Sequence, residues 1–413
     1  HADTAPYRDV PANNEFAGYI AYCQKEGIIS GYADGAFRPG NPLTGYAFMK
    51  MLLGALGYDA TLEGYVGDNW SINVAKQAIH IGLEDGIEGE FNGIKPVNRE
   101  EACLYAFNTL QADLVEYNQR LTTTINGMEV TLSSGGAQSR KWNSQQTRID
   151  HIREDDIIQF AEEYFRKLEK KLGDDEFMRP AYTWIYDKEE IGTFVDWSLL
   201  VEEYNVGVSG RDMYDLLGNA LLSDEDMNLV YYFNGVEPDE HCGMPSWVVG
   251  GSYAGEKNIT KENNVLRRNN QNDVGFTGRG VLTQVFVDKD VRESIIITSI
   301  DTWLTKASAD YLEAKESAPI EVWTVEATNT SKTYNVDVQD VPEIADVTED
   351  TFYLANISFK DDVDDGEVVT VWEPEILEDS AVTKFSLPSA NGSTQVPDKV
   401  TVSGTEYKKA VRG

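Results

Sequence analysis

The most constraining feature of this chain is an internal repeat near its start. Six residue pairs recur at an offset of 54 or 55: Phe16 with Trp70, Ala21 with Ala75, Gly27 with Gly82, Pro42 with Pro96, Thr44 with Asn98, and Leu56 with Leu110. A constant offset of this kind marks two copies of one supersecondary unit. Residues 1–117 are therefore expected to fold as two copies of the same structure.

Each copy is expected to contain a helix, a loop and a second helix. The first helices are predicted over residues 14–25 and 70–81, because apolar residues recur there at helical spacing. Thr44 and Asn98 are placed to cap the second helices, and Glu101 completes a capping box with Asn98. The apolar faces that follow are expected to pack on each other: Phe48, Met51, Leu52 and Ala55 in the first copy, and Ala102, Tyr105, Ala106 and Leu110 in the second.

These stretches resemble a known family. The segments YRDVPANNEFAGYIAYCQKEGIISGYADGAFRPGNPLTGYAF and NWSINVAKQAIHIGLEDG, the latter followed by KPVNREEA, are similar to the S-layer homology (SLH) repeat. That repeat joins an aromatic residue in the first helix to a GYxDGxFxP loop and a TRAEF-like start of the second helix. The resemblance implies a cell-surface protein of a Gram-positive anaerobe that binds secondary cell-wall polysaccharide, its signal peptide already removed.

The resemblance also implies a glycan-binding site formed by Arg99, Trp70, Tyr32, Asp34 and Arg38. In the family, the arginine of TRAE meets the acidic group of the glycan, and Arg99 holds that place in the second copy. Gly45 stands there in the first copy, so one pocket at most keeps the charge that holds an anionic sugar. The alternative that these aromatic residues only shape the fold stays open.

The chain changes character after residue 117. Residues 118–150 are predicted to form a hairpin around Asn126-Gly127 and a linker, residues 151–274 a mixed α+β domain, and residues 275–413 β-rich modules. The longest single helix is predicted over residues 154–172. The fold class is therefore multidomain: all-α SLH-like helical repeats, then an α+β domain, then all-β, sandwich-like modules, with the chain expected to continue past Gly413.

Strand predictions for the second half follow from β-type runs between turn clusters. Two strands are expected within residues 179–196 and two within 278–304, a short helix at 209–217, and further strands at 229–233, 320–325, 351–357, 367–372 and 399–402.

The charge of the chain excludes two classes of partner. It has 35 Lys and Arg residues against 70 Asp and Glu residues, a net charge of −35. Such a surface repels phosphate backbones and anionic lipids. No apolar run reaches the roughly 18 residues that a bilayer span needs. We therefore expect no nucleic-acid partner and no membrane insertion.

No catalytic template is evident in the sequence. The four histidines (His1, His80, His151 and His241) lie in no zinc motif, and there is no nucleophile elbow, P-loop or dinucleotide fingerprint. His241-Cys242 lies in a Gly-Pro loop without an orienting partner. Cys23 and Cys103 are expected to be small buried residues outside any disulfide framework. The chain is therefore predicted not to be an enzyme.

Calcium is the one cofactor that the sequence leaves open. Asp361, Asp362, Asp364 and Asp365 precede Gly366. An EF-hand register starting at Asp361 puts Val363 at a ligand position and Trp372 in place of the bidentate glutamate. A solvated acidic turn is therefore the favoured interpretation.

These observations predict a non-enzymatic structural protein of the cell surface. It would attach to cell-wall polymer, assemble with other copies of itself into a layer or fibre, or do both. Two alternatives stay open: an SLH-anchored glycan hydrolase with its site between residues 150 and 300, and a carbohydrate-binding adhesin that uses exposed Trp and Tyr side chains.

Overall fold

The fold is taken from a computed structural model of the chain. It describes residues 3–32, 34–87, 89, 91–117, 121–125, 128–132, 136–238, 257–323, 332–363, 365–375, 381–386 and 399–410. The chain divides into two compact units. Unit 1 comprises His1–Lys171 and Thr183–Gly192, and unit 2 comprises Leu172–Tyr182 and Thr193–Gly413.

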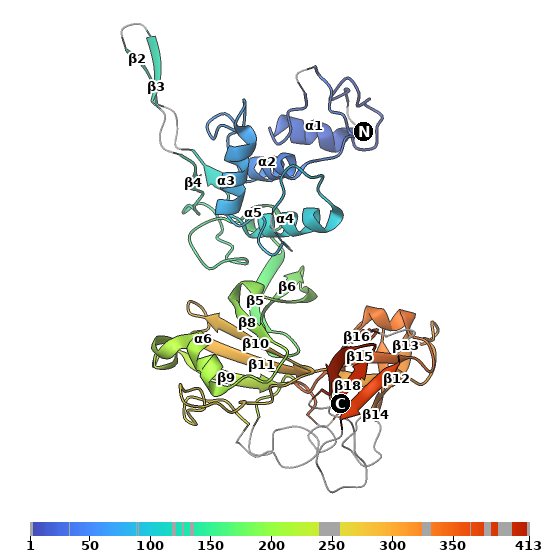
Figure 1. Cartoon of the computed structure of the whole chain (residues 1–413). Helices are drawn as coiled ribbons and strands as arrows, with labels where there is room; N and C mark the ends of the chain where they lie inside the picture. Colours follow the sequence, from blue (N-terminus) through green and yellow to red (C-terminus); the bar gives the residue numbers. More distant parts are fainter. Residues whose placement is uncertain are drawn as a thin grey trace. The chain divides into compact units, whose positions relative to one another are not determined.

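Unit 1 begins with the helices that the repeat predicted. They are α1 (Ala17–Lys25), α2 (Gly45–Ala55), α3 (Trp70–His80) and α4 (Arg99–Gln111) (Figure 1). The Thr44 hydroxyl accepts a hydrogen bond from the Ala47 amide at 3.4 Å, and Asn98 and Glu101 form the expected capping box. Both predicted caps are confirmed.

The helices of the two copies pack on each other, but on a different face of α2 from the one predicted. The rings of Phe48 and Tyr105 lie 6.3 Å apart, which joins α2 to α4. The residues that α2 buries completely are Met49 and Leu53, whereas Met51 and Leu52 are only partly buried. The prediction considered α4 alone as the partner, but α2 also packs against α3, and this rotates its buried stripe.

Two short pairings follow the helices. Strands β1 (Val115–Glu116) and β4 (Gln138–Ser139) pair antiparallel. Strands β2 (Leu121–Ile125) and β3 (Met128–Leu132) form the predicted hairpin. The Asn126-Gly127 turn itself lies outside the described residues.

The helix predicted over residues 154–172 is wrong. Only α5 (Phe160–Tyr164) is helical, and β5 (Leu168–Asp174) is a strand. The backbone of Ile158 is already bonded on both sides, its N–H to the Arg140 carbonyl and its carbonyl to the Leu114 N–H, each at 2.9 Å. This pairing with distant segments overrides the local helical pattern.

Strand β5 belongs to a sheet with β6 (Pro180–Tyr186) and β7 (Glu189–Val195), in the order β5-β6-β7. The pair β6 and β7 confirms the two strands expected within residues 179–196. The division between the units passes through all three strands.

Unit 2 contains a mixed sheet of four strands in the order β8-β10-β11-β9. After a 3₁₀ turn η1 (Trp197–Leu199), its elements are β8 (Leu200–Tyr204), α6 (Gly210–Leu222), β9 (Asn228–Phe233), β10 (Val281–Asp288) and β11 (Ser294–Asp301). Strand β9 runs parallel to β11, and the other pairs are antiparallel. This sheet contains strands from both sides of the boundary that the sequence placed between residues 274 and 275.

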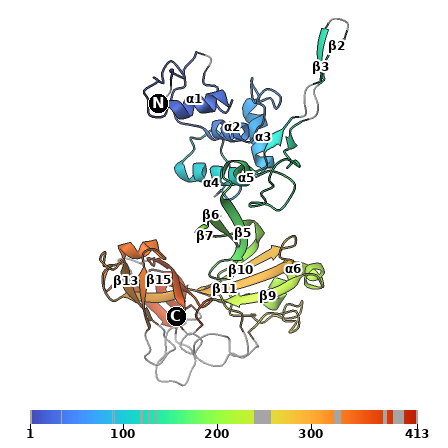
Figure 2. The same ribbon diagram turned by 180° about the vertical axis from the view of Figure 1, so that it is seen from behind.

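A five-stranded antiparallel sheet follows, in the order β14-β13-β12-β15-β16. Two of its strands, β13 and β15, are labelled in Figure 2. Its elements are β12 (Trp303–Ala307), β13 (Ser317–Trp323), β14 (Lys332–Asp337), the 3₁₀ turn η2 (Pro342–Asp346), β15 (Phe352–Ser358) and β16 (Glu367–Trp372). Buried residues of this sheet and of the four-stranded sheet form one hydrophobic core. Strands β17 (Val382–Ser386), β18 (Lys399–Val402) and β19 (Thr405–Lys408) form a last, separate sheet. Helical repeats followed by a sheet-rich remainder are thus confirmed.

Candidate functional site

Three of the five predicted site residues lie together on the loop of the first copy. The Arg38 guanidinium lies 4.1 Å from the centre of the Tyr32 ring and 3.0 Å from the Asp34 carboxylate. Arg8 approaches the same carboxylate at 2.5 Å. All four side chains are exposed. The loop therefore offers two guanidinium groups and one aromatic face to solvent.

Backbone hydrogen bonds give this loop its shape. The Asp9 carboxylate accepts from the amides of Phe37 at 2.8 Å and Arg38 at 2.7 Å. The Tyr7 ring stacks on Phe37 with 5.3 Å between the ring centres. Gly31 has φ of +64°, and a Cβ there would collide with the Tyr7 ring, so the first glycine of the GYxDG pattern is required sterically.

The Asp34 carboxylate is held in its ionised form. A hydrogen bond from the Ala36 amide and, after it, the neighbouring Arg38 and Arg8 guanidinium groups lower the pKa of Asp34. Hydrogen bonds from the amides of Phe37 and Arg38 likewise lower the pKa of Asp9. The two guanidinium groups of Arg8 and Arg38 are thus balanced by two ionised carboxylates, Asp34 beside them and Asp9 on the loop backbone.

The other two predicted residues, Trp70 and Arg99, lie at the starts of helices in the second copy. Trp70 is half-buried, and its ring meets Tyr46 edge-on with 6.5 Å between ring centres. Arg99 is the exposed first residue of α4. Within the described residues, no hydrogen bond, ion pair or ring contact joins Arg99 to Trp70 or to the first loop. The structure thus brings three of the five residues together and leaves these two apart.

Gly45 cannot be replaced by an arginine without movement of the backbone. A Cβ at Gly45 would lie 2.9 Å from the Gly93 Cα and 3.2 Å from the Asn92 carbonyl oxygen. The amides of Gly45 and Tyr46 donate to the carbonyls of Lys95 at 3.0 Å and Gly93 at 2.9 Å. The loop of the second copy therefore fills the space that an arginine side chain at position 45 would need.

Sequence reasoning missed three residues that shape or extend these surfaces. Arg8 and Asp9 lie in the YRDVP segment and support the first loop. Lys50 on α2 lies with its ammonium 5.4 Å from the Trp70 ring centre, and burial lowers the pKa of Lys50. Position 50 carried no sequence signal, because its proximity to Trp70 arises only when α3 packs on α2.

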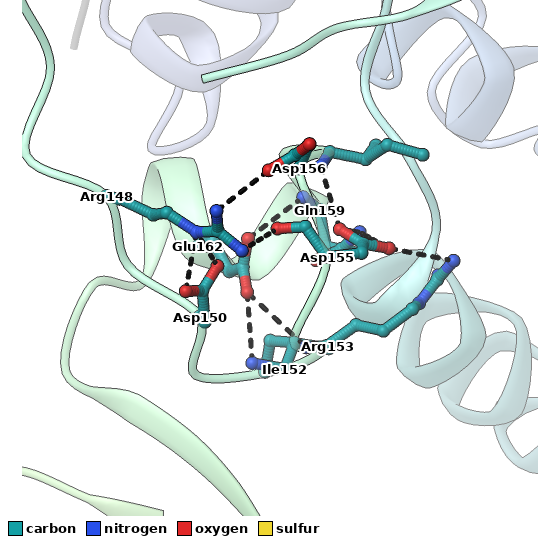
Figure 3. A network of polar contacts seen from close by, with 9 residues as sticks. Arg148, Asp150, Ile152, Arg153, Asp155, Asp156, Gln159 and Glu162 are labelled. Carbon is teal, nitrogen blue, oxygen red and sulfur yellow. Dashed lines mark hydrogen bonds and ion pairs between the residues drawn. The ribbon is translucent and has the colours of Figure 1, made fainter. Parts of the chain in front are cut away.

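A network of polar contacts lies on the segment that follows the repeats (Figure 3). The Arg148 guanidinium contacts the Asp150 carboxylate at 2.6 Å and the Asp156 carboxylate at 2.8 Å. The Glu162 carboxylate is fully buried and accepts from the amides of Ile152 at 3.1 Å and Gln159 at 3.3 Å. Burial raises the pKa of Glu162. These contacts close the loop onto α5, which is a structural role.

The cysteine and histidine residues singled out in the sequence can be compared with the structure. Cys103 is exposed, so its predicted burial is wrong, because the α4 face that carries it is not covered; Cys23 is partly buried. His1, His241 and Cys242 lie outside the described residues.

The acidic turn contains hydrogen bonds of its own. The Asp362 carboxylate accepts from the Asp365 amide at 3.0 Å, and the Asp365 carboxylate pairs with Lys332 at 2.5 Å. Asp361 is exposed, and Asp364 lies outside the described residues. Across the described ranges, no group of three or more His, Cys, Asp or Glu side chains is arranged to hold a metal ion. The solvated acidic turn stays the favoured prediction, and calcium binding there stays the open alternative.

Comparison with known proteins identifies the first repeat. Residues 6–45 match the family model of the S-layer homology domain. The chain is 27% identical over 110 residues to the middle cell wall protein of Brevibacillus brevis, and 28% identical over 81 residues to the surface layer protein of Brevibacillus choshinensis. No solved structure matches the chain. The SLH resemblance of the first copy is confirmed.

Each match covers only a part of this chain and a part of the relative. They include 27% and 20% of this chain, and they span only 10% and 7% of the two relatives. Among the described residues, no helix is long and apolar enough to cross a membrane.

Proposed function

We propose that the chain is a non-enzymatic structural protein of the cell surface that attaches to cell-wall polysaccharide through its N-terminal repeats and assembles with further copies of itself. The observation that carries the proposal is the SLH match over residues 6–45, which contain the exposed loop with Tyr32, Asp34 and Arg38. Both relatives are named as cell-wall or surface-layer proteins. The bacterium would be Gram-positive and anaerobic.

The attachment chemistry follows from the cations of the repeats. An acidic secondary polymer would be repelled by a chain with a net charge of −35, so binding requires local cationic groups. Arg38 and Arg8 on the first loop and Arg99 on α4 supply planar guanidinium groups that pair bidentately with a carboxylate. The exposed face of Tyr32 offers a stacking surface for a sugar ring.

A sedimentation assay with cell-wall sacculi tests the attachment. The full chain is mixed with sacculi before and after chemical removal of the secondary polymers. We expect binding only to the untreated walls. We also expect Arg99→Ala to bind at least about tenfold more weakly, which corresponds to about 1.4 kcal/mol. Arg166→Ala is the matched control, because Arg166 is an exposed arginine outside the repeats.

Two results would contradict the attachment proposal. Equal binding to intact and stripped walls would show that the polymer is not the ligand. Equal weakening by Arg99→Ala and Arg166→Ala would show that general charge, rather than the α4 residue, holds the chain on the wall.

Electron microscopy of the purified chain tests assembly, with and without Ca²⁺. Sheets or filaments are expected, and monodisperse particles under both conditions would contradict self-assembly. A dependence on Ca²⁺ would direct attention to the acidic turn at residues 361–366.

A further inference from the structure

The last sheet of unit 2 carries cationic side chains on one face. In the antiparallel register, Lys408 of β19 lies opposite Lys399 of β18, and Lys384 of β17 lies opposite Thr401 of β18. Residues two positions apart on a strand point the same way, so the three lysines share a face. Glu406 lies opposite Thr401 and pairs with Lys399 at 3.0 Å. Three lysines against one carboxylate leave this face positively charged.

This cationic region belongs to a strongly acidic protein. Residues 380–413 contain five Lys and Arg against two Asp and Glu, a net charge of +3, whereas the whole chain has a net charge of −35. Lys399, and after it Lys408 and Lys384, lower the pKa of Glu406, so this carboxyl is held in its ionised form by the lysines around it. The partner that such a region favours is an acidic surface.

Strand β19 forms an open edge of this sheet. Among the described strands it pairs with β18 alone, and all four of its residues are exposed. The residues after β19 hold the sheet on unit 2, because Arg279 donates from Nε to the Lys409 carbonyl at 3.0 Å, and Ala410 lies against Gly280. The outer edge of β19 therefore presents backbone N–H and C=O groups to which another strand can bind.

Strand β8 forms a second open edge, and this one is acidic. It ends the four-stranded sheet and pairs with β10 alone within the described ranges. Glu202 and Glu203 are both exposed. The Glu203 amide donates to the Glu202 carboxylate at 3.0 Å rather than to a strand, and the Glu203 carboxylate accepts from the neutral amide of Gln284 at 2.8 Å. Neither contact neutralises a carboxylate, so the edge of β8 keeps two negative charges.

We propose that β19 of one molecule pairs with β8 of a second copy of this chain. The three-stranded sheet of one molecule then extends the four-stranded sheet of the next. Backbone hydrogen bonds along the two edges supply the affinity, as in other cases of strand addition. The occupant follows from charge complementarity, since every copy carries one cationic and one acidic edge, and in a single molecule these edges belong to separate sheets.

The charges also decide which edges meet. Two β8 edges would place Glu202 and Glu203 of one molecule against the same carboxylates of another, and like charges that face each other across two strands are destabilising. The pairing of β8 with β19 uses two different surfaces and is therefore heterologous, so each added molecule leaves one edge of each kind free and the assembly extends.

This inference rests on the self-assembly part of the proposed function and does not depend on polymer attachment. The test is sedimentation velocity of the full chain over a range of concentrations. Glu202→Lys reverses the charge of the β8 edge, and Lys408→Glu reverses that of the β19 edge. Glu313→Lys and Lys289→Glu are the matched controls, because they make the same charge changes at exposed positions of unit 2 away from both edges. Circular dichroism checks that each variant is folded.

We expect each edge variant alone to associate about fivefold more weakly than its control. Mixed in equal amounts, the two edge variants should associate as strongly as the unchanged chain, since the reversed β8 edge then meets the reversed β19 edge and the unchanged edges meet each other. The difference between variants and controls should shrink in about 1 M salt, because salt screens exposed charges.

Hydrogen exchange measured by mass spectrometry locates the contact. On association of the unchanged chain, residues 200–204 and 405–408 should exchange more slowly, because their outer amides gain strand partners. Strand β14, the edge of the five-stranded sheet, should exchange as before and is the internal control.

Three outcomes would overturn the inference while the proposed function survives. They are edge variants that associate like their controls, a mixture that associates no better than its components, and unchanged exchange at β8 and β19 when the chain assembles. In each case the chain self-associates through another surface. A chain that stays monomeric at every concentration would overturn both the β8–β19 contact and self-assembly. If Lys408→Glu weakens binding to intact sacculi and leaves association unchanged, the cationic face binds the acidic polymer instead, and the inference is wrong.

Discussion

The two copies of the repeat share one sequence pattern but differ in which parts they bury. The second copy places its loop against the start of α2, and its helices share one core with α2 that continues into Ile158, beyond the repeats. The N-terminal part of the first copy has a small core of its own, formed by Tyr7, Val10 and Ala17, and the loop of the first copy faces solvent.

The difference explains why each copy kept a different half of the SLH signature. A loop that packs against a helix start needs small residues such as Gly93, because the Tyr46 ring lies against it. A loop that faces solvent has room for Tyr32 and Arg38, provided that Asp9 and Asp34 hold its backbone. Packing between the copies and exposure of the Tyr32 and Arg38 side chains are therefore alternative uses of the same loop.

The largest effect is expected from restoring the family arginine in the first copy. Gly45→Arg forces a side chain into the space held by Gly93 and Asn92, and this overpacking should destabilise the contact between the copies by about 3 kcal/mol or more. Hydrogen exchange measured by mass spectrometry should show faster exchange in α2 and in residues 91–97.

The reverse substitution in the second copy is the control. Arg99→Gly lies at the equivalent but exposed position, and it should leave exchange across α2 unchanged, with only the small loss expected for a glycine in the first turn of α4. Similar protection of α2 in Gly45→Arg and in the unchanged chain would mean that the second loop does not need this glycine.

The sequence was enough to predict the features that depend on residues close by in the chain. The caps at Thr44 and Asn98 depend on residues three positions away, and strands β16 and β18 have the bounds that the β-type runs predicted. The loop residues Tyr32, Asp34 and Arg38 lie within one motif, so their proximity could be expected from the SLH resemblance.

Features that depend on contacts with residues far away in the chain could not be predicted from local patterns. The exposure of Cys103 depends on what covers α4, and the packing of Gly45 depends on a loop almost fifty residues further on. The helix predicted over residues 154–172 failed because the backbone of Ile158 pairs with residues 114 and 140. A helical pattern of side chains carries no information about such partners.

A second prediction concerns the segment whose Ile158 belongs to the core shared by α2, α3 and α4. Glu162→Ala should destabilise the loop at residues 150–159 by about 2 kcal/mol, because three amides lose their acceptor inside the protein. Amide exchange of Ile152 and Gln159 should accelerate, and the protection of α3 should fall with it, whereas α1 should not change. Glu154→Ala, an exposed residue of the same loop, is the control. Equal acceleration in α1 would show that the small core of Tyr7, Val10 and Ala17 unfolds together with the core that contains Ile158.

The smallest effect is expected from the two helix caps. Asn98→Ala should cost about 1 kcal/mol, since it removes a 2.8 Å bond to the Glu101 amide and leaves the reciprocal bond of the capping box without its anchor. Thr44→Ala should cost less, about 0.5 kcal/mol. The Thr44 bond is long, at 3.4 Å, and the amides of Gly45 and Tyr46 already bind carbonyls of the second loop.

The free energy of opening of each helix start, measured by amide exchange in the two variants, checks this order. A larger loss for Thr44→Ala would mean that the second loop contributes little to the start of α2. The contact between the second loop and the start of α2 would then be weaker than the close approach of Gly45 and Gly93 implies. The Thr44 cap, rather than this contact, would hold the start of the helix.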